Sequence, residues 1–393
     1  MSADTPQAVG ERIAARRRAR RLTQRRLAEA SQVSYSTIRA VERGARRPSD
    51  DTLEALAAAL GVDATQLRTG FHGTERRVHG ALPALSAAIA GYEIPQGLPT
   101  CREDALATAV GVAEEWRLNA QYGRIASTIP SVLADAIRHI HTAPAREHTA
   151  AARMLASAAR TADAIAYKYG AHDLSARLID LMRWAADRSA DPLVAATASY
   201  VRTETFFAAR AYAIGLTALE QAVDNAPAPT SQLKAAARGA LHMRAAVIAG
   251  RAENADAADL HLGHARRLAV QVGREGTYLG TSFGPDSVRI HEVSVAVGLG
   301  PRHTDRALRA AEKWKPPNSL PAERRSGFYI ELARAQNWAG LSGDAFESLK
   351  SARATAPQHT REHPWAREVA GAVRRHFRGG EDVTRFCEWI GAV

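Results

Sequence analysis

Four polar side chains crowd one short segment of the chain, and their chemistry suits the edges of DNA bases. They are Tyr35, Ser36, Thr37 and Arg39. Hydroxyl and guanidinium groups can hydrogen-bond to the donors and acceptors that base pairs present in the major groove. Ser34 is a good N-cap, and Ile38 and Val41 are spaced as on one face of a helix. We therefore predict a short helix that buries Ile38 and Val41 and presents the four polar side chains to bases.

A second set of side chains around this segment can bind phosphate. Residues 1–79 contain fifteen Arg and nine Asp or Glu, a net +6 out of +11 for the whole chain. Such clustering is typical of surfaces that neutralise DNA phosphates. The chain has five Lys against forty-seven Arg, so the clustering of Arg supports this interpretation better than its abundance. The side chains predicted to hold the DNA backbone lie at helix ends or in a loop: Gln24, Arg25, Arg43, Arg46 and Arg47.

The neighbouring residues predict the elements that position these groups. Thr23 can cap a preceding helix, and a tight turn at residues 31–33 leads from it into the base-reading helix. Ala28 is small, as expected where two helices cross steeply over a short turn. A further helix follows over residues 52–62. Residues 11–67 therefore predict a complete five-helix helix-turn-helix domain.

This stretch resembles the Xre/Cro family of phage-repressor-like DNA-binding domains. The family pattern is a Gln that opens the second helix, a Glu-x-Gly after the third, and then a basic residue with Pro. Here these residues are Gln24, Glu42-Arg43-Gly44 and Arg47-Pro48. The resemblance also implies a largely buried ion pair between an Arg of the first helix and the Glu that ends the third. The matching positions are Arg17 and Glu42.

Between this domain and the rest of the chain, residues 69–100 combine many Gly and Pro, which indicates a linker. Leu82, Leu85 and Ile89 could form one short helix within it. We expect such a tether to let the N-terminal domain change its orientation. The predicted division is a helix-turn-helix domain at 1–69, a linker at 70–100, and a helical domain at 101–393.

From residue 102 onward the chain favours helices that recur in pairs. The clearest pair is 233–272. The other predicted pairs are 148–188, 191–224, 287–314 and 323–356, with a weaker pair at 103–142. Their turns are expected at Gly170, near Gly215, at 298–303, at 340–343 and, for the weaker pair, at 122–123. Only 6% of the residues are aromatic and β-branched runs are scarce, so we predict an all-α protein.

The layout resembles tetratricopeptide-like repeats, with residues 337–345 closest to that family. Its period of about forty residues exceeds the usual thirty-four, and the consensus Trp-Leu-Gly signature is absent. The predicted fold is therefore a five-helix Xre-type domain followed by an α-solenoid of tetratricopeptide-like helix pairs. Residues 357–391 would form a terminal cap with Trp389 and Ile390 packed inward. An irregular helical bundle without solenoid curvature is the alternative.

An Xre-type domain followed by such repeats resembles many actinobacterial regulators and the peptide-sensing quorum regulators of Gram-positive bacteria. The resemblance implies a transcription factor whose repeats dimerise and hold a small-molecule or peptide effector in a groove built from the first helices of successive pairs. The actinobacterial group also resembles this chain at residues 283–291, which makes Arg289 and His291 candidate effector-binding residues. A plain turn with an N-cap at Asp286 or Ser287 is the alternative for this segment.

No pattern in the chain indicates an enzyme, a cofactor or a metal site. A phosphate loop, a nucleophile elbow and a dinucleotide fingerprint are all missing from the sequence. Several histidines cluster without Cys or paired carboxylates, which predicts surface residues and not metal ligands. These are His139, His141, His148, His261 and His264. Two distant cysteines, no signal peptide and no long apolar run lead us to expect a cytoplasmic, nucleoid-associated protein without a membrane segment.

The sequence thus predicts a transcriptional regulator that binds an inverted repeat in double-stranded DNA as a homodimer. One alternative is an interaction scaffold, whose repeats bind another protein while the N-terminal domain only localises it on DNA. Another is an antitoxin-like or phage-type repressor of a neighbouring gene. Strong preference for one short operator would favour the regulator, and sequence-indifferent DNA binding would favour the scaffold.

Overall fold

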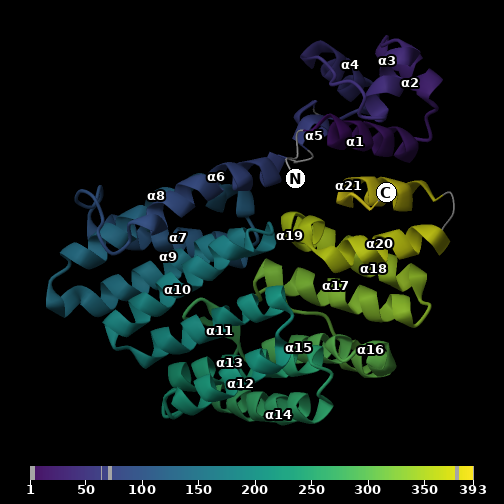
Figure 1. Ribbon diagram of the computed structural model, residues 1–393. Coiled ribbons are helices and arrows are strands. Elements are labelled where there is room, and N and C mark those ends of the chain that lie inside the picture. The colour runs from purple at the N-terminus through teal and green to yellow at the C-terminus, as the bar shows by residue number, and fades with distance from the viewer. Residues whose placement is uncertain (1–4, 63, 70–72, 377–379, 393) are drawn as a thin grey trace. The chain divides into compact units, whose positions relative to one another are not determined.

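The computed structural model of the chain describes residues 5–62, 64–69, 73–376 and 380–392 (Figure 1). These residues belong to two compact units, each with its own interior. Unit 1 comprises Met1–Arg76 together with Thr384–Val393, and unit 2 comprises Arg77–Val383. Helices dominate both units. The predicted class is confirmed: an all-α chain with a helix-turn-helix domain followed by a helical repeat domain.

The five predicted helices of unit 1 are present. They are α1 (Pro6–Ala19), α2 (Gln24–Ser31), α3 (Tyr35–Glu42), α4 (Asp50–Leu60) and α5 (Ala64–Thr69). Both predicted N-caps are confirmed. The hydroxyl of Thr23 accepts a hydrogen bond from the main-chain N–H of Arg26 at 3.2 Å. The hydroxyl of Ser34 accepts one from the N–H of Thr37 at 3.2 Å.

Helix α3 is fixed by its buried face in unit 1. Ile38 and Val41 are fully buried together with Leu27 of α2. Gly10 lets α1 approach α3 closely, because a Cβ atom at this position would lie 2.1 Å from the main-chain oxygen of Val41. One side of α3 is therefore packed against α1 and α2, and the opposite side is exposed.

Helix α6 (Gly73–Ala90) occupies most of the segment that was expected to be a linker. Val78, Leu85 and Ile89 of this helix are buried in the core of unit 2. Gly80 meets open space, and Pro83 lies inside the helix. The segment is helical despite its Gly and Pro content because tertiary packing of an apolar stripe outweighs weak local propensity.

Within the described residues 103–355, unit 2 contains the six predicted helix pairs (Figure 1). They are α7 (Glu103–Leu118) with α8 (Tyr122–Thr142), α9 (His148–Lys168) with α10 (His172–Ser189), α11 (Pro192–Ala209) with α12 (Tyr212–Asn225), α13 (Gln232–Arg251) with α14 (Ala255–Val272), α15 (Pro285–Gly298) with α16 (Thr304–Ala311), and α17 (Ala322–Trp338) with α18 (Ser342–Thr355). Two short 3-10 turns, η1 (Ala145–Glu147) and η2 (Pro301–His303), precede α9 and α16.

Two predicted turns are wrong. Tyr122 and Gly123 lie inside α8, and the chain turns just before them, at residues 119–121. The chain turns between α11 and α12 at Arg210 and Ala211, and Gly215 is buried inside α12. A Cβ atom on Gly215 would lie 2.3 Å from Cδ1 of Ile248, so this glycine serves a close crossing between helices. Gly250 has a similar role, since its Cβ would lie 3.0 Å from the main-chain oxygen of Val295 in α15.

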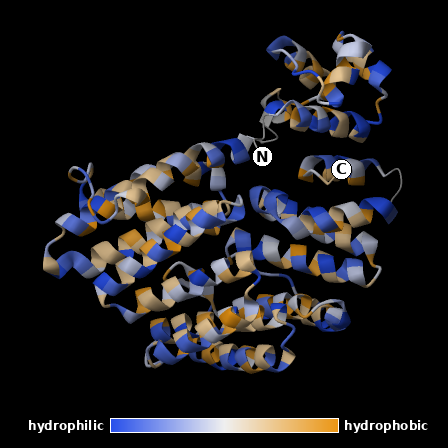
Figure 2. Cartoon of the chain, in the orientation of Figure 1, coloured by the Kyte–Doolittle hydropathy of each residue, from blue (hydrophilic) through white to orange (hydrophobic). Residues whose placement is uncertain are grey.

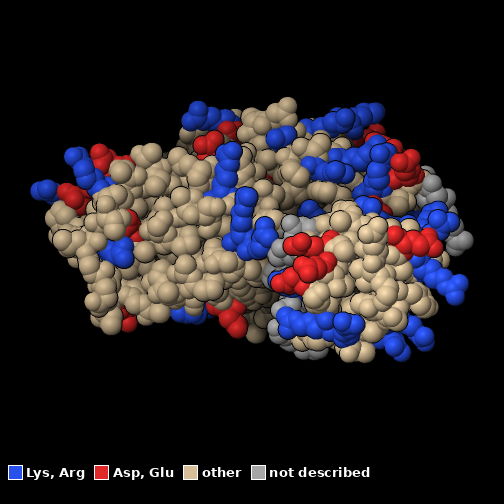
Figure 3. All heavy atoms as spheres, turned by 90° about the horizontal axis from the view of Figure 1, so that it is seen from above, with Lys and Arg blue, Asp and Glu red and all other residues tan. Residues whose placement is uncertain are grey.

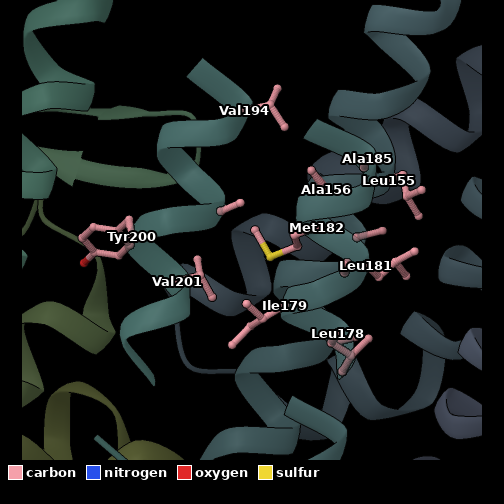
Figure 4. Close-up of a cluster of buried hydrophobic side chains, with 14 of the residues drawn as sticks. Leu155, Ala156, Leu178, Ile179, Leu181, Met182, Ala185, Val194, Tyr200 and Val201 are labelled. Atoms are coloured by element: carbon pink, nitrogen blue, oxygen red, sulfur yellow. The ribbon is translucent and has the colours of Figure 1, made fainter. Parts of the chain in front are cut away.

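The interior of unit 2 forms where helices of neighbouring pairs meet. Figure 4 shows Leu155 of α9, Leu178 and Met182 of α10, and Val201 of α11 in one part of it. Tyr200 projects from α11 on the side away from Met182. Polar and apolar residues are mixed along each helix of the unit, as expected for helices that are buried on some faces only (Figure 2).

A short hairpin interrupts the helices of unit 2. Strands β1 (Gly276–Tyr278) and β2 (Thr281–Phe283) pair antiparallel, and they are the strands found among the described residues. Leu279 and Gly280 have φ values of 49° and 69°, as two-residue hairpin turns require. Phe283 is fully buried against Gly239 of α13, whose Cβ would lie 2.0 Å from the Phe283 ring. This hairpin has no counterpart among the predicted elements.

Three helices end the chain: α19 (Pro357–Glu362), α20 (Pro364–His376) and α21 (Glu381–Ile390). Ile390 is buried, and Trp389 is half-buried. Residues from Thr384 onward belong to unit 1, where the main-chain oxygen of Glu388 accepts a hydrogen bond from Arg16 at 3.4 Å. Among the helices that the structure describes, none has the length and apolar character needed to cross a bilayer.

Candidate nucleic-acid interface and repeat cavity

Helix α3 presents the four candidate base-reading side chains away from its buried face. Tyr35, Ser36 and Arg39 are exposed, and Thr37 is half-buried. The Ser34 hydroxyl lies 3.1 Å from the hydroxyl of Ser36 and donates to that of Thr37 at 2.8 Å. These hydroxyls form a small network at the start of α3. Tyr35 and Arg39 are the longer side chains and extend furthest from the helix.

The candidate backbone-binding arginines border α3 on both sides. All four of these arginines are exposed: Arg25, Arg43, Arg46 and Arg47. The guanidinium carbon of Arg25 lies 5.9 Å from the ring centre of Tyr35, and Arg43 Nε donates to the main-chain oxygen of Arg39 at 3.2 Å. Figure 3 shows Lys and Arg in several groups on one face of the chain, with Asp and Glu groups between them.

Arg17 and Glu42, the residues that the family resemblance pairs, are in double contact. Arg17 Nε donates to Glu42 Oε1 at 2.6 Å and Nη2 donates to Oε2 at 2.9 Å. Only 13% of the Arg17 side chain and 5% of the Glu42 side chain are exposed. The hydrogen bond to Glu42 raises the pKa of Arg17 above its usual value. Gln24, a candidate backbone contact, donates its Nε2 to Glu42 Oε2 at 2.8 Å, so α1, α2 and α3 meet at this carboxylate.

Unit 2 contains a cavity of about 690 Å³. Its walls include side chains from the first helix of each of the six pairs, from the hairpin, and from α19 and α20. The first helices of stacked pairs form the concave surface of a helical repeat array, which is where such arrays bind partners. The cavity therefore lies where the repeats predict a binding surface.

The candidate effector residues have different positions. His291 is buried and lines the cavity. Arg289 does not line it, because its guanidinium packs on Trp314 at 4.9 Å and donates to the main-chain oxygen of Ala310 at 3.2 Å. Arg289 and His291 are two positions apart on α15, so their side chains point in different directions from the helix.

A hydrogen-bonded chain fixes the protonation of His291. Nδ1 lies 2.7 Å from the main-chain oxygen of Ser287 and donates to it, so the lone pair is on Nε2. Arg324 Nη1 donates to this Nε2 at 2.8 Å, and Arg324 Nη2 donates to the hydroxyl oxygen of Tyr200 at 3.0 Å. Burial and the nearby Arg324 hold the pKa of His291 well below its usual value. His291 is therefore neutral near pH 7.

Two of the acidic side chains that line the cavity, Glu323 and Asp163, have pKa values shifted by burial and by neighbouring groups. Lys168 Nζ lies 2.7 Å from Glu323 Oε1. Burial alone would raise the pKa of Glu323, but Lys168 and His359 lower it to about 2. Burial and the neighbouring Glu204 instead raise the pKa of Asp163 well above its usual value. Glu204 Oε2 has no hydrogen-bond partner within the described part of the chain.

The prediction that the clustered histidines lie on the surface is wrong for His261. His261 is 5% exposed, and its Nδ1 lies 3.0 Å from that of His242 on the adjoining helix. The helix pair α13 and α14 is rich in Ala and packs closely enough to enclose these rings. In the part of the chain that the structure describes, no group of three or more His, Cys, Asp or Glu is placed to hold a metal ion.

Comparison with known proteins supports the assignment of the N-terminal domain. Residues 13–67 match the helix-turn-helix family model HTH_3. A similar protein is the immunity repressor protein of Bacillus phage phi105, which is 46% identical over 59 residues. The match covers 15% of this chain and 41% of the repressor, so the chain spans less than half the length of this relative. The fold and the matched segment define an Xre-type helix-turn-helix domain joined to a helical repeat unit.

Two solved structures show weaker similarity. Bacillus thuringiensis PlcR, crystallised with the peptide PapR7 and DNA, is 14% identical, with 68% of this chain and 96% of PlcR covered and a TM-score of 0.26. The apo form of the competence regulator ComR from Streptococcus vestibularis is 12% identical, with 90% and 93% covered and a TM-score of 0.24. No functional property follows from similarities at TM-scores this low.

Proposed function

We propose that the protein is a sequence-specific DNA-binding transcriptional regulator. The observation that supports this function most directly is the geometry of α3. Ile38 and Val41 hold the helix in the core of a domain that matches a helix-turn-helix family, and Tyr35, Ser36 and Arg39 are exposed on it. A helix mounted in this way can lie in a major groove with its side chains at base edges.

The repeat unit has the sensing role in this proposal. Its cavity of about 690 Å³ falls within the range of small-molecule sites, which is roughly 300–1,000 Å³. A small-molecule or peptide effector bound there would change the affinity of the protein for DNA, and by linkage DNA would change the affinity for the effector by the same factor. The proposed DNA partner is an inverted repeat that is bound by a homodimer in the cytoplasm.

Selection from a random double-stranded DNA library tests the proposal. We expect enrichment of a short inverted repeat that the protein prefers to random DNA by about a thousandfold or more. The affinity should fall steeply with increasing salt, because bound phosphates release counterions. Weak binding to all sequences alike would contradict the proposal and favour an interaction scaffold that is merely localised on DNA.

A further inference from the structure

Three arginines of the cavity converge on one tyrosine. Arg324 Nη2 donates to the hydroxyl oxygen of Tyr200 at 3.0 Å. The guanidinium carbons of Arg244 and Arg160 lie 4.7 Å and 5.5 Å from the centre of the Tyr200 ring. The three arginines come from α17, α13 and α9, and all four side chains line the cavity. Like charges are thus concentrated in a small buried volume.

The hydrogen bonds of these arginines go mostly to neutral groups. Arg160 donates to the main-chain oxygen of Leu279 at 2.8 Å and to the hydroxyl of Thr281 at 2.7 Å. Arg324 donates to the neutral ring of His291. Arg244 Nε donates to a threonine hydroxyl at 2.8 Å. Neutral acceptors satisfy the N–H groups but do not compensate the positive charges.

A fourth arginine extends the same cluster. Arg117 is 7% exposed and lines the cavity beside the hairpin. Its Nη2 donates to the main-chain oxygen of Gly280 at 2.9 Å, whereas its Nε has no hydrogen-bond partner among the described residues. Burial and the positive charge of Arg117 lower the pKa of Arg160 to about 9. Such a buried donor needs an acceptor, which a water, an ion or a ligand can supply.

The acidic side chains nearby do not balance this charge. Of the four arginines, Arg244 alone forms an ion pair within the described residues. Its contact with Glu204 is long, at 3.5 Å. Glu323 is paired with Lys168. Burial raises the pKa of Glu331 to about 7, so its negative charge near neutral pH is weakened. The acidic side chains of Glu114 and Glu204 also act on Arg160. Two acidic groups against four arginines still leave the cluster with more positive than negative charge, which would attract an anion from outside.

We propose that the cavity binds a small organic anion, whose carboxylate or phosphate lies among Arg160, Arg244 and Arg324 beside the Tyr200 hydroxyl. This inference rests on the proposed function, because it names the chemistry of the effector. Guanidinium groups bind planar carboxylates and phosphates through two parallel N–H donors, and the three groups here approach from different helices. An anion at this point would link α9, α11, α13 and α17 directly.

Tyr200 supplies a spectroscopic reporter of the anion. Burial would raise its pKa, but Arg324, Arg244 and Arg160 together lower it to about 8. An anion that neutralises these arginines removes their stabilisation of the Tyr200 phenolate. The pKa of Tyr200 then rises toward its usual value. At pH 8 the absorbance of ionised tyrosine should therefore fall as the anion binds, and a Tyr200→Phe variant should not show this fall.

The test uses the full-length protein at constant ionic strength. Inorganic phosphate and succinate are titrated separately, and the melting temperature and the tyrosinate absorbance at pH 8 are recorded. We expect both signals to saturate with the same midpoint, whereas sodium chloride has no saturable effect. Tighter binding of phosphate would identify a phosphate ester as the natural ligand, and tighter binding of succinate would identify a carboxylate.

Matched variants locate the site. Arg160→Gln and Arg324→Gln should each weaken the binding of the better anion by about tenfold or more. Arg202→Gln should leave it unchanged, since Arg202 is exposed on the same helix as Tyr200. If a Gln variant does not fold, Arg324→Lys retains the charge without the planar donors and should still weaken binding.

Two results would overturn the inference. One is the absence of a saturable effect of both anions, and the other is equal binding by the Arg202, Arg160 and Arg324 variants. Sequence-specific DNA binding that persists in either case would leave the proposed function standing. Loss of sequence preference in the DNA selection would instead remove the proposed function itself, whatever the anions do.

Discussion

At the scale of single residues, the Glu42 carboxylate holds the DNA-binding domain together. It accepts hydrogen bonds from Arg17 at 2.6 Å and 2.9 Å and from Gln24 at 2.8 Å, and it is almost wholly buried. The resemblance to the Xre/Cro family implied the pairing of Arg17 with Glu42. The contact of Gln24 could not be derived from the sequence, because a Gln at the start of a helix can equally face solvent or phosphate.

Replacing Glu42 with Ala should unfold unit 1 and abolish DNA binding. Removal of one partner leaves the Arg17 guanidinium buried without compensation, which costs about 3–5 kcal/mol when burial is complete. Thermal melting followed by circular dichroism measures the effect. Glu54→Ala is the control, since Glu54 is exposed on α4 and its loss should be nearly neutral. A Glu42→Ala protein with an unchanged melting profile would contradict the prediction.

Arg39 and Arg47 should differ in what their loss does to DNA binding. Arg39 is exposed on α3, where it can reach a base edge, so Arg39→Ala should cost about 1–3 kcal/mol at its cognate base pair and relax the choice there. Arg47 lies in the loop after α3, so Arg47→Ala should weaken binding to all sequences alike and flatten the salt dependence. Affinities for single-base operator variants decide between these outcomes. Equal loss on every sequence for Arg39→Ala would refute its assignment.

His359 should make unit 2 less stable in acid. Burial and Lys168 lower its pKa to about 4, below the unfolded value of 6.5. Between these two values the unfolded chain binds more protons, so stability falls as the pH falls. From pH 7 to pH 5 this histidine alone should remove about 2 kcal/mol. Urea unfolding at both pH values should show a smaller loss for His359→Gln, and equal losses in the two proteins would contradict this.

At the scale of elements, the close approach of α1 to α3 positions the DNA-binding face. A Cβ on Gly10 would lie 2.1 Å from the main-chain oxygen of Val41. Gly10→Ala should therefore force the helices apart and destabilise the domain by about 1–3 kcal/mol. Gly80→Ala in α6 is the matched control, because its Cβ meets open space and should stabilise by about 0.5–1 kcal/mol. Melting temperatures that move in the same direction for both variants would contradict this account.

Helix pairs could be predicted from the sequence because their signals are local. Caps, turns and apolar spacing located α9 with α10 and α13 with α14, each within a few residues. Local signals failed where tertiary contact decides. Gly215 and Gly80 resemble helix breakers but are inside helices, and three-residue strands such as β1 are too short for an alternating pattern.

The cavity residues could be predicted only in part, for a related reason. Arg160 and Asp163 fall within the Ala-rich stripe of α9 that is buried, and their charge at such positions was the available signal. Their convergence with Tyr200 and Arg324 depends on how separate pairs stack, which no local pattern records. A family resemblance identified His291 as a candidate effector-binding residue. Its neutral state follows only from its neighbours in the structure.

At the scale of the whole molecule, we expect a dimer that is held by unit 2. Tyr35 is the one large hydrophobic residue exposed in the described part of unit 1, whereas unit 2 exposes several. These are Ile94, Leu98, Val112, Ile214, Leu233, Leu260, Val270 and Leu341. Two domains about 34 Å apart would then match successive half-sites of an operator.

Light scattering at micromolar concentration measures the predicted assembly. The full chain should have the mass of a dimer, and a chain that begins at residue 73 should remain dimeric. The truncated chain begins at residue 73 because α6 supplies Val78 and Leu85 to the core of unit 2. A monomer in both measurements would exclude the dimer.

The hydrogen bonds around the cavity also determine how unit 2 comes apart. In a simple repeat array each pair touches only its neighbours, so unfolding can start at one end and spread stepwise. Here Arg117 of α7 bonds to Gly280, which is 163 residues further along the chain, and Arg324 bonds to Tyr200 across 124 residues. Loss of the first pair therefore deprives the distant hairpin of one of its partners, Arg117. Amide protons of the inner helices should exchange with solvent together, as one cooperative block, and the ends should not fray independently.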